Sequence, residues 1–224
     1  EAPAPAPEVF TDGLGREVSL ERTPERIISL APSITETLYA VGAGGQLIGR
    51  DEFSNYPAEA QELPSVGGSM GDYNLELIVS LKPDLVLAAE INTPEQVKAL
   101  EDLGITVYYF SNPTDIEGVY GLLTTTGDLT GHSEEAAALV ESLKERVAAA
   151  EAKADKAFST PKVFYELDGS DPAKPWTAGS GTFIDLLIQM AGGENVASTM
   201  EGSWGQFSQE ALIMADPDFI LLGD

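Results

Sequence analysis

An internal repeat constrains the fold more than any other feature of the chain. Residues 74–87 and 208–221 share one pattern: a polar residue suited to capping a helix, a glutamate two positions later, an apolar helix face, then Pro-Asp and an apolar strand. The copies lie much further apart than the units of a solenoid, so the pattern predicts two related lobes. A looser parallel agrees, because residues 43–45 and 191–193 both have the sequence Ala-Gly-Gly after a predicted helix.

Short apolar strands and capped helices alternate along the chain. Strands are predicted within residues 26–31, 46–50, 81–88, 105–110 and 162–167. Helices are predicted from Ser33, which has the form of a capping box with Glu36, to a stop at Gly42, and after Asn74 and Thr93. The alternation predicts an α/β protein with mostly parallel sheets.

A long segment without glycine or proline follows these units. Residues 133–158 are rich in Ala, Glu, Lys and Leu, which predicts one helix of about 40 Å. We interpret it as a rigid strut between two lobes, with a surface helix inside one domain as the alternative. The predicted organisation is an Ala/Pro spacer (1–8), an N-terminal α/β lobe (9–131), an interlobe helix (132–158) and a C-terminal α/β lobe (159–224), with a ligand cleft between the lobes.

The composition excludes several classes of function. With 12 basic and 37 acidic residues, the formal charge of −25 disfavours nucleic acid and anionic lipid as partners. The chain has no cysteine and no apolar run of the roughly 20 residues that span a bilayer. Its one histidine, His132, is expected to be solvent-exposed, and it leaves neither a hydrolytic triad nor a zinc or manganese site. We therefore expect no catalytic residue, resident metal or cofactor.

Two other classes stay open. Chance pairs among the 37 acidic residues leave room for a carboxylate-dependent hydrolase such as a glycosidase. A surface adhesion module would instead expose an apolar patch for another protein.

The alternating Ala and Pro at the amino terminus form a stiff spacer, typical of what remains when a signal or lipid-anchor segment is removed. We expect a periplasmic or extracellular location, with a lipid anchor upstream of residue 1 as one form of attachment.

Aromatic residues gather in predicted loops. Phe53, Tyr56 and Tyr73 lie between strands of the first lobe, and Trp176 and Trp204 lie in loops of the second. Flat aromatic faces suit a large planar or amphipathic ligand. The alternative is that each tryptophan only anchors its own loop.

Several motifs together resemble one known family. They are residues 12–18, 26–36, 53–57, 63–67, 74–76 with 81–86, and 192–195. In this order, and over nearly the whole chain, they are similar to the metal-chelate class of periplasmic substrate-binding proteins. Members of that class have two α/β lobes joined by one long helix, and they deliver vitamin B12, ferric siderophores or haem to ABC importers. The segment 53–57, Phe-Ser-Asn-Tyr-Pro, is most similar to the vitamin B12 binders.

The resemblance implies roles for particular residues. The predicted ligand contacts are Phe53, Tyr56, Met70, Tyr73, Trp176 and Trp204. The resemblance implies contact roles for Phe53, Trp176 and Trp204 among them. Glu76 and Glu210 would dock a two-subunit ABC permease, and the protein would act as a monomer. Where the vitamin B12 binders often carry further tryptophans, this chain has Ser69 or Met70 and Ala89.

Charge and length add two expectations. Only Arg50 and Lys174 are placed to meet a negative ligand, which favours a neutral or weakly charged chelate. The family continues beyond the position of Asp224, so the second lobe is expected to be incomplete.

Overall fold

The computed structural model of the chain describes residues 7–68 and 72–223. These residues divide into two units, of which unit 1 ends at Glu141 and unit 2 begins at Ser142. The boundary falls inside helix α5 (Ser133–Ala154). This helix ends four residues earlier than predicted, because residues 155–157 tighten into a turn and the fully exposed Phe158 has no packing to extend it. Its role as a rigid strut between lobes stays a prediction.

Unit 1 is built on a parallel four-stranded sheet with the order β4-β3-β5-β6. Its strands are β3 (Ile27–Ser29), β4 (Leu47–Arg50), β5 (Leu85–Ala89) and β6 (Val107–Phe110). Every residue of β5 and β6 is buried, as expected for apolar strands covered on both faces. The predicted strands are confirmed, although each is shorter than its predicted range. At β5 the strand starts late because Lys82, Pro83 and Asp84 form the turn after α2 (Leu75–Leu81).

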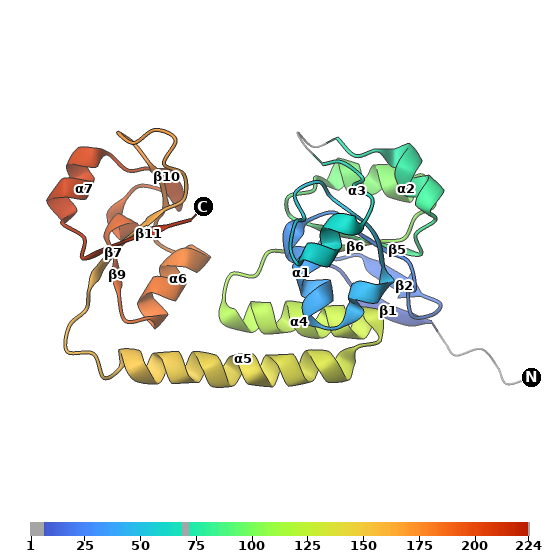
Figure 1. Cartoon of the computed structure of the whole chain (residues 1–224), viewed down its shortest axis with the longest axis horizontal. Helices are drawn as coiled ribbons and strands as arrows, with labels where there is room; N and C mark the ends of the chain where they lie inside the picture. Colours follow the sequence, from blue (N-terminus) through green and yellow to red (C-terminus); the bar gives the residue numbers. More distant parts are fainter. Residues whose placement is uncertain (1–6, 69–71, 224) are drawn as a thin grey trace, which may run out of the picture. The chain divides into compact units, whose positions relative to one another are not determined.

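Helices cover both faces of this sheet. They are α1 (Pro32–Ala40), α2 (Leu75–Leu81), α3 (Pro94–Glu101) and α4 (Ile116–Thr130), with 3-10 turns η1 (Ala43–Gln46) and η2 (Ala58–Glu62). In Figure 1, α2 and α3 lie on one side of the sheet and α1 and α4 on the other. The chain therefore winds outward in one direction from β3 to β4 and in the opposite direction through β5 to β6. The strand order reverses between β3 and β5.

One predicted helix start is wrong. The N-cap of α1 is Ala31, which makes no side-chain capping bond, and Pro32 occupies the first turn. Because proline fixes a helical φ, the helix begins before Ser33, which lies exposed inside it. The capping box of Thr93 with Gln96 is present at α3.

A hairpin that was not predicted from sequence packs against the rest of unit 1. Its strands are β1 (Glu8–Thr11) and β2 (Glu17–Leu20), so β1 begins at the last residue of the predicted spacer. At the turn, the buried carboxylate of Asp12 accepts hydrogen bonds from the backbone of Leu14 and Arg16 (both 3.0 Å) and from the Arg16 guanidinium. Arg16 also pairs with Glu101 in α3, and this ion pair ties the hairpin to the unit.

Unit 2 contains a smaller parallel sheet with the order β11-β7-β9 and an antiparallel ribbon of β8 and β10. The strands are β7 (Lys162–Glu166), β8 (Trp176–Ala178), β9 (Glu194–Asn195), β10 (Trp204–Gln206) and β11 (Phe219–Leu222). The helices are α6 (Phe183–Met190) and α7 (Gln209–Ala215), with a 3-10 turn η4 (Val196–Thr199). Phe164 is fully buried, and its ring centroid lies 5.5 Å from that of Phe207.

The two copies of the predicted repeat have the same local structure. The side chains of Asn74 and Ser208 accept the N–H groups of Leu77 and Ala211 at the starts of α2 and α7. Both helices then end on a non-glycine residue in the left-handed region: Lys82 (φ 50°) and Asp216 (φ 48°).

The turn after each helix is anchored in the same way. The carboxylate of Asp84 accepts from the backbone N–H of Arg26, and that of Asp218 accepts from Lys162, with distances of 2.9 and 2.8 Å. The side chains of Arg26 and Lys162 in turn donate to the last carbonyls of α2 and α7. The looser parallel, which aligned residues 43–45 with residues 191–193, is displaced by two residues in the structure. The glycines that end α1 and α6 in the left-handed conformation are Gly42 and Gly192.

Candidate functional site

The carboxyl end of the unit 1 sheet has the geometry of a ligand-binding edge. Open α/β sheets bind ligands beside the carboxyl ends of the strands where strand order reverses, which here means beside β3 and β5. At this point the backbone oxygen of Leu30 accepts hydrogen bonds from the Tyr73 hydroxyl (3.1 Å) and the Asn92 amide (3.3 Å). Asn92 also donates to the Tyr73 hydroxyl (2.6 Å). The Tyr73 hydroxyl is therefore occupied by hydrogen bonds within the protein, and only the ring of Tyr73 is left to contact a ligand.

The surroundings of Tyr73 agree with this inward orientation. Burial raises the pKa of its hydroxyl, and the nearby carboxylate of Asp51 raises it further, although the hydrogen bond from Asn92 opposes both. Tyr73 thus stays neutral and holds the ends of β3 and β5 together. Sequence reasoning missed Asn92, which is 1% exposed and lies three residues after the end of β5.

Two predicted contact residues lie on the loop that follows β4. Phe53 is 54% exposed and Tyr56 is 66% exposed, which is unusual for large aromatic side chains. Arg50 holds this loop from within, since its guanidinium donates to the backbone oxygens of Ala60 and Asp51 (both 2.8 Å). The third predicted contact of this region, Met70, lies outside the described residues.

The two tryptophans lie in strands, so their prediction as loop residues is wrong. In the antiparallel ribbon Trp204 pairs with Ala178, and Gln206 pairs with Trp176. Because directly opposite residues share a face, as do residues two apart, Trp176 and Trp204 lie on the same face of the ribbon. They are diagonal neighbours and are 42% and 50% exposed. The strands are only three residues long, which is too short for alternation to reveal them in sequence.

The ribbon is attached to the carboxyl end of β7. Leu167 donates its backbone N–H to Trp176 (2.8 Å), and the N–H of Trp176 donates to Asp168 (2.9 Å). Below the ribbon, the buried amide of Asn195 donates to Ala178 (2.9 Å) and to the carboxylate of Asp185 (3.0 Å). In each unit, exposed aromatic rings therefore stand at the carboxyl end of that unit's own sheet.

The two predicted docking glutamates occupy equivalent positions. Glu76 is the second residue of α2 and Glu210 is the second residue of α7, and both are exposed. Each carboxylate lies in the first turn of its helix, where negative charge is favourable. The geometry leaves both available at the surface.

Other chemistry is sparse among the described residues. Within ranges 7–68 and 72–223, no group of three or more His, Asp or Glu side chains is arranged to hold a metal ion. His132 is partly buried rather than exposed as predicted, because it lies beside Gly42 and its Nδ1 is 2.9 Å from the backbone oxygen of Thr130. In the part of the chain that is described, no helix is long and apolar enough to cross a membrane.

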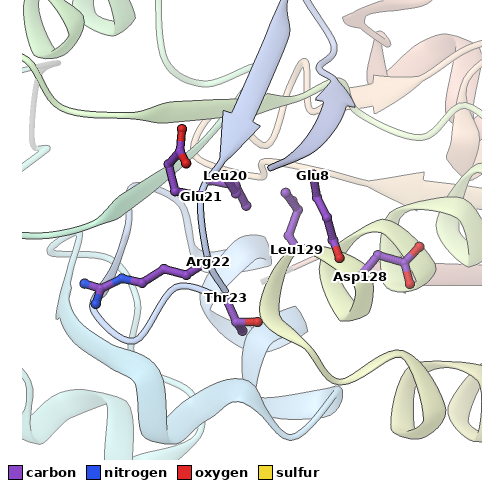
Figure 2. Close-up of a pocket in the computed structure, with 7 residues that line it drawn as sticks. All are labelled: Glu8, Leu20, Glu21, Arg22, Thr23, Asp128 and Leu129. Carbon is purple, nitrogen blue, oxygen red and sulfur yellow. The ribbon is translucent and has the colours of Figure 1, made fainter. Parts of the chain in front are cut away.

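Two cavities border the described part of unit 1. One of about 120 Å³ lies between the hairpin and the end of α4, and its lining is Glu8, Leu20, Glu21, Arg22, Thr23, Asp128 and Leu129. In Figure 2, Arg22 points away from Glu8 and Asp128, so the charges do not converge on one ligand position. Another, of about 180 Å³, borders Tyr73 and Gln96.

Comparisons with known proteins connect these features to a family. A family model described as periplasmic binding protein matches residues 27–224. The cobalamin-binding protein of Halobacterium salinarum is 36% identical over 97% of this chain and 58% of its own length. An uncharacterized ABC transporter substrate-binding lipoprotein of Bacillus subtilis, YvrC, is 30% identical over 97% of this chain and 69% of its own.

A solved structure adds the three-dimensional match. The periplasmic heme-binding protein RhuT from Roseiflexus sp. RS-1 superposes with a TM-score of 0.77 at 29% identity, over 88% of this chain and 76% of that one. The chain thus spans little more than half the length of the Halobacterium relative and about three quarters of this structure. Because the matched family model covers most of the sequence, the chain belongs to the periplasmic binding protein family.

Proposed function

We propose that this chain is the extracytoplasmic ligand-capturing component of an ABC importer and that it binds a metal chelate, with a corrinoid such as vitamin B12 favoured over a ferric siderophore or haem. The observation that carries the proposal is the pair of exposed aromatic sets, Phe53 with Tyr56 and Trp176 with Trp204, at the carboxyl ends of the two sheets. Flat aromatic faces of this kind suit a large planar ligand, and such binding needs no catalytic group.

The comparisons support this choice of class. They name binding proteins for cobalamin and heme and a substrate-binding lipoprotein of an ABC transporter, whereas a glycosidase would need a carboxylate pair at a defined separation. The cobalamin-binding relative and the segment 53–57 favour a corrinoid. The lipoprotein relative supports a periplasmic or extracellular location with a lipid anchor.

The charge around the aromatic residues supports a neutral or weakly charged chelate. Arg50, one of two expected partners for a negative ligand, already donates to backbone oxygens of its own loop. Lys174 remains exposed in the loop before β8. A highly anionic ferric catecholate would call for more free cations than these.

A fluorescence titration tests the proposal. Trp176 and Trp204 are the only tryptophans, so cyanocobalamin, haemin or a ferric siderophore that binds over them should quench most of the emission. Trp204→Ala should weaken binding by about 1 kcal/mol or more, because the variant lacks a half-exposed ring that the ligand would bury. Phe158→Ala, which alters an exposed ring elsewhere in unit 2, is the control. Unchanged affinity in both single tryptophan variants would remove the role of the aromatic residues.

A transport assay tests the proposed docking to a two-subunit permease. Reversing Glu76 and Glu210 to Lys should leave chelate affinity nearly unchanged and sharply reduce stimulation of the transporter's ATPase, because charges on the rim of an interface steer the encounter. Glu95 and Glu117 are matched controls, since both are exposed first-turn carboxylates on other capped helices. Normal stimulation by the Glu76/Glu210 variant would reduce these residues to helix-end carboxylates.

A further inference from the structure

Three buried polar side chains meet under the exposed aromatic loop of unit 1. The carboxylate of Asp51, 2% exposed, accepts the backbone N–H of Phe53 (2.8 Å) and the hydroxyl of Ser54. The Ser54 hydroxyl also lies 2.8 Å from the hydroxyl of Thr35, which belongs to α1. Asp51 itself donates its backbone N–H to Ser29 at the end of β3 (2.9 Å). The cluster therefore connects the loop to β3, β4 and α1.

Burying these groups is costly, so their arrangement calls for a physical reason. A carboxylate and two hydroxyls lose hydration when buried, and an apolar core of the same volume would not incur this loss. The hydrogen bonds above offset this loss, and they hold the backbone N–H of Phe53 and the side chain of the next residue, Ser54. Phe53 is held in this way although 54% of its own surface is exposed.

An exposed aromatic ring gains little stability for the free protein from being held in place. A ring that a ligand later covers, however, binds more tightly if its loop is already ordered, because less conformational freedom is lost on association. The guanidinium of Arg50 supports the same loop from its other side, through the backbone oxygens of Ala60 and Asp51. Two sets of hydrogen bonds, from Asp51 and from Arg50, thus hold the start of the loop, while the rings of Phe53 and Tyr56 remain more than half exposed.

We infer that Asp51, with Ser54 and Thr35, is a positioning residue that keeps Phe53 in its ligand-binding conformation before the ligand arrives. The inference rests on the proposed function, since Phe53 is one of the proposed ligand contacts. Asp51 acts through the backbone of Phe53 and the hydroxyl of Ser54, and it makes no contact with the chelate.

Calorimetric titration of the whole chain with cyanocobalamin, and with haemin in parallel, tests this role. Ser54→Ala should weaken binding about tenfold, which corresponds to the loss of a hydrogen bond to a charged group. In a Phe53→Ala background the same substitution should have no further effect, because the cluster acts only through Phe53. Ser54→Thr, which keeps the hydroxyl, should restore most of the affinity.

Thr126→Ala is the matched control. Thr126 is 1% exposed, and its hydroxyl donates to the backbone oxygen of Leu122 (2.8 Å) inside α4. This variant loses a buried hydroxyl bond of similar kind and should bind cyanocobalamin like the unaltered protein. An equal loss of affinity in Thr126→Ala, or an equal effect of Ser54→Ala with and without Phe53, would show a general loss of stability and overturn the inference.

Hydrogen exchange gives a readout that needs no ligand. In Ser54→Ala the amide of Phe53, which donates to Asp51, should exchange at least tenfold faster, while those of β5 stay unchanged. Asp51→Asn should accelerate exchange in the same loop by a smaller factor. This variant replaces Ser54→Ala in the experiment if Ser54→Ala does not fold. Unchanged exchange in the loop contradicts the inference. If the unaltered protein binds no cyanocobalamin, haemin or ferric siderophore, the proposed function and this inference both fail, whereas binding that Ser54→Ala leaves intact removes only the positioning role.

Discussion

The two copies of the repeat have the same local geometry and very different surroundings. In unit 1, β5 lies between β3 and β6 and all of its residues are buried. In unit 2, β11 is the edge strand of its sheet, and its four residues, Phe219 to Leu222, are each about half exposed. Helix α2 buries Ile78, whereas α7 buries none of its residues. Caps and turns thus determine the shape of a helix–turn–strand segment, and neighbouring elements determine how much stability it contributes.

The largest expected difference is between Leu87 and Leu221, which lie at equivalent places in β5 and β11. Leu87 is fully buried and Leu221 is 47% exposed. Leu87→Ala should lower the free energy of unfolding by about 2–5 kcal/mol through lost burial and a residual cavity. Leu221→Ala should change it by about 0.5 kcal/mol or less. Urea unfolding followed by circular dichroism measures both. Similar losses would mean that β11 is covered in solution.

A smaller difference is expected between the two helix caps. Asn74→Ala should destabilise unit 1 by about 0.5–2 kcal/mol, because α2 is packed and its loss exposes Ile78. Ser208→Ala should instead open α7 locally, since little burial holds this helix when its cap is gone.

Hydrogen exchange separates the two outcomes for the caps. In Ser208→Ala, the amides of α7 should lose protection while those of β7 keep it. A uniform loss across unit 2 would show that α7 is part of the cooperative core.

The smallest expected effect is a change in how stability depends on pH. Burial opposes ionisation of Asp12, but hydrogen bonds from Arg16 and Leu14 outweigh it and lower the pKa of this carboxyl below its ordinary 3.8. A lowered folded pKa means that the stabilisation is fully present above the unfolded value and is lost as pH falls through the folded value. Unfolding midpoints should therefore decline below about pH 4. The decline should be shallower in Asp12→Asn, and an identical slope would contradict the assignment.

Sequence predicted the parts of the fold that local chemistry determines. Asn74, Ser208 and Thr93 were identified as helix starts because a capping side chain acts within three residues of itself. The β8–β10 ribbon was missed because its pairing joins Trp176 to a partner far along the chain. In the candidate site the exposed aromatic residues stood out, while Asp51 did not, since one buried carboxylate is hidden among 37 acidic residues. The signal that was available is an aspartate directly after a strand and three residues before a serine.

The left-handed residues Lys82 and Asp216 have a consequence for recognising such segments in other chains. Helices that end in this conformation usually do so on glycine, yet neither copy of the repeat uses one. Pro83 and Pro217 follow at once and disfavour a helical conformation in the residue before them. Asp84 and Asp218 then bind the start of the neighbouring strand. The left-handed position therefore does not need a glycine in this kind of segment. A search pattern that requires a terminal glycine would overlook both copies, whereas a pattern of a capped short helix followed by Pro-Asp would find them.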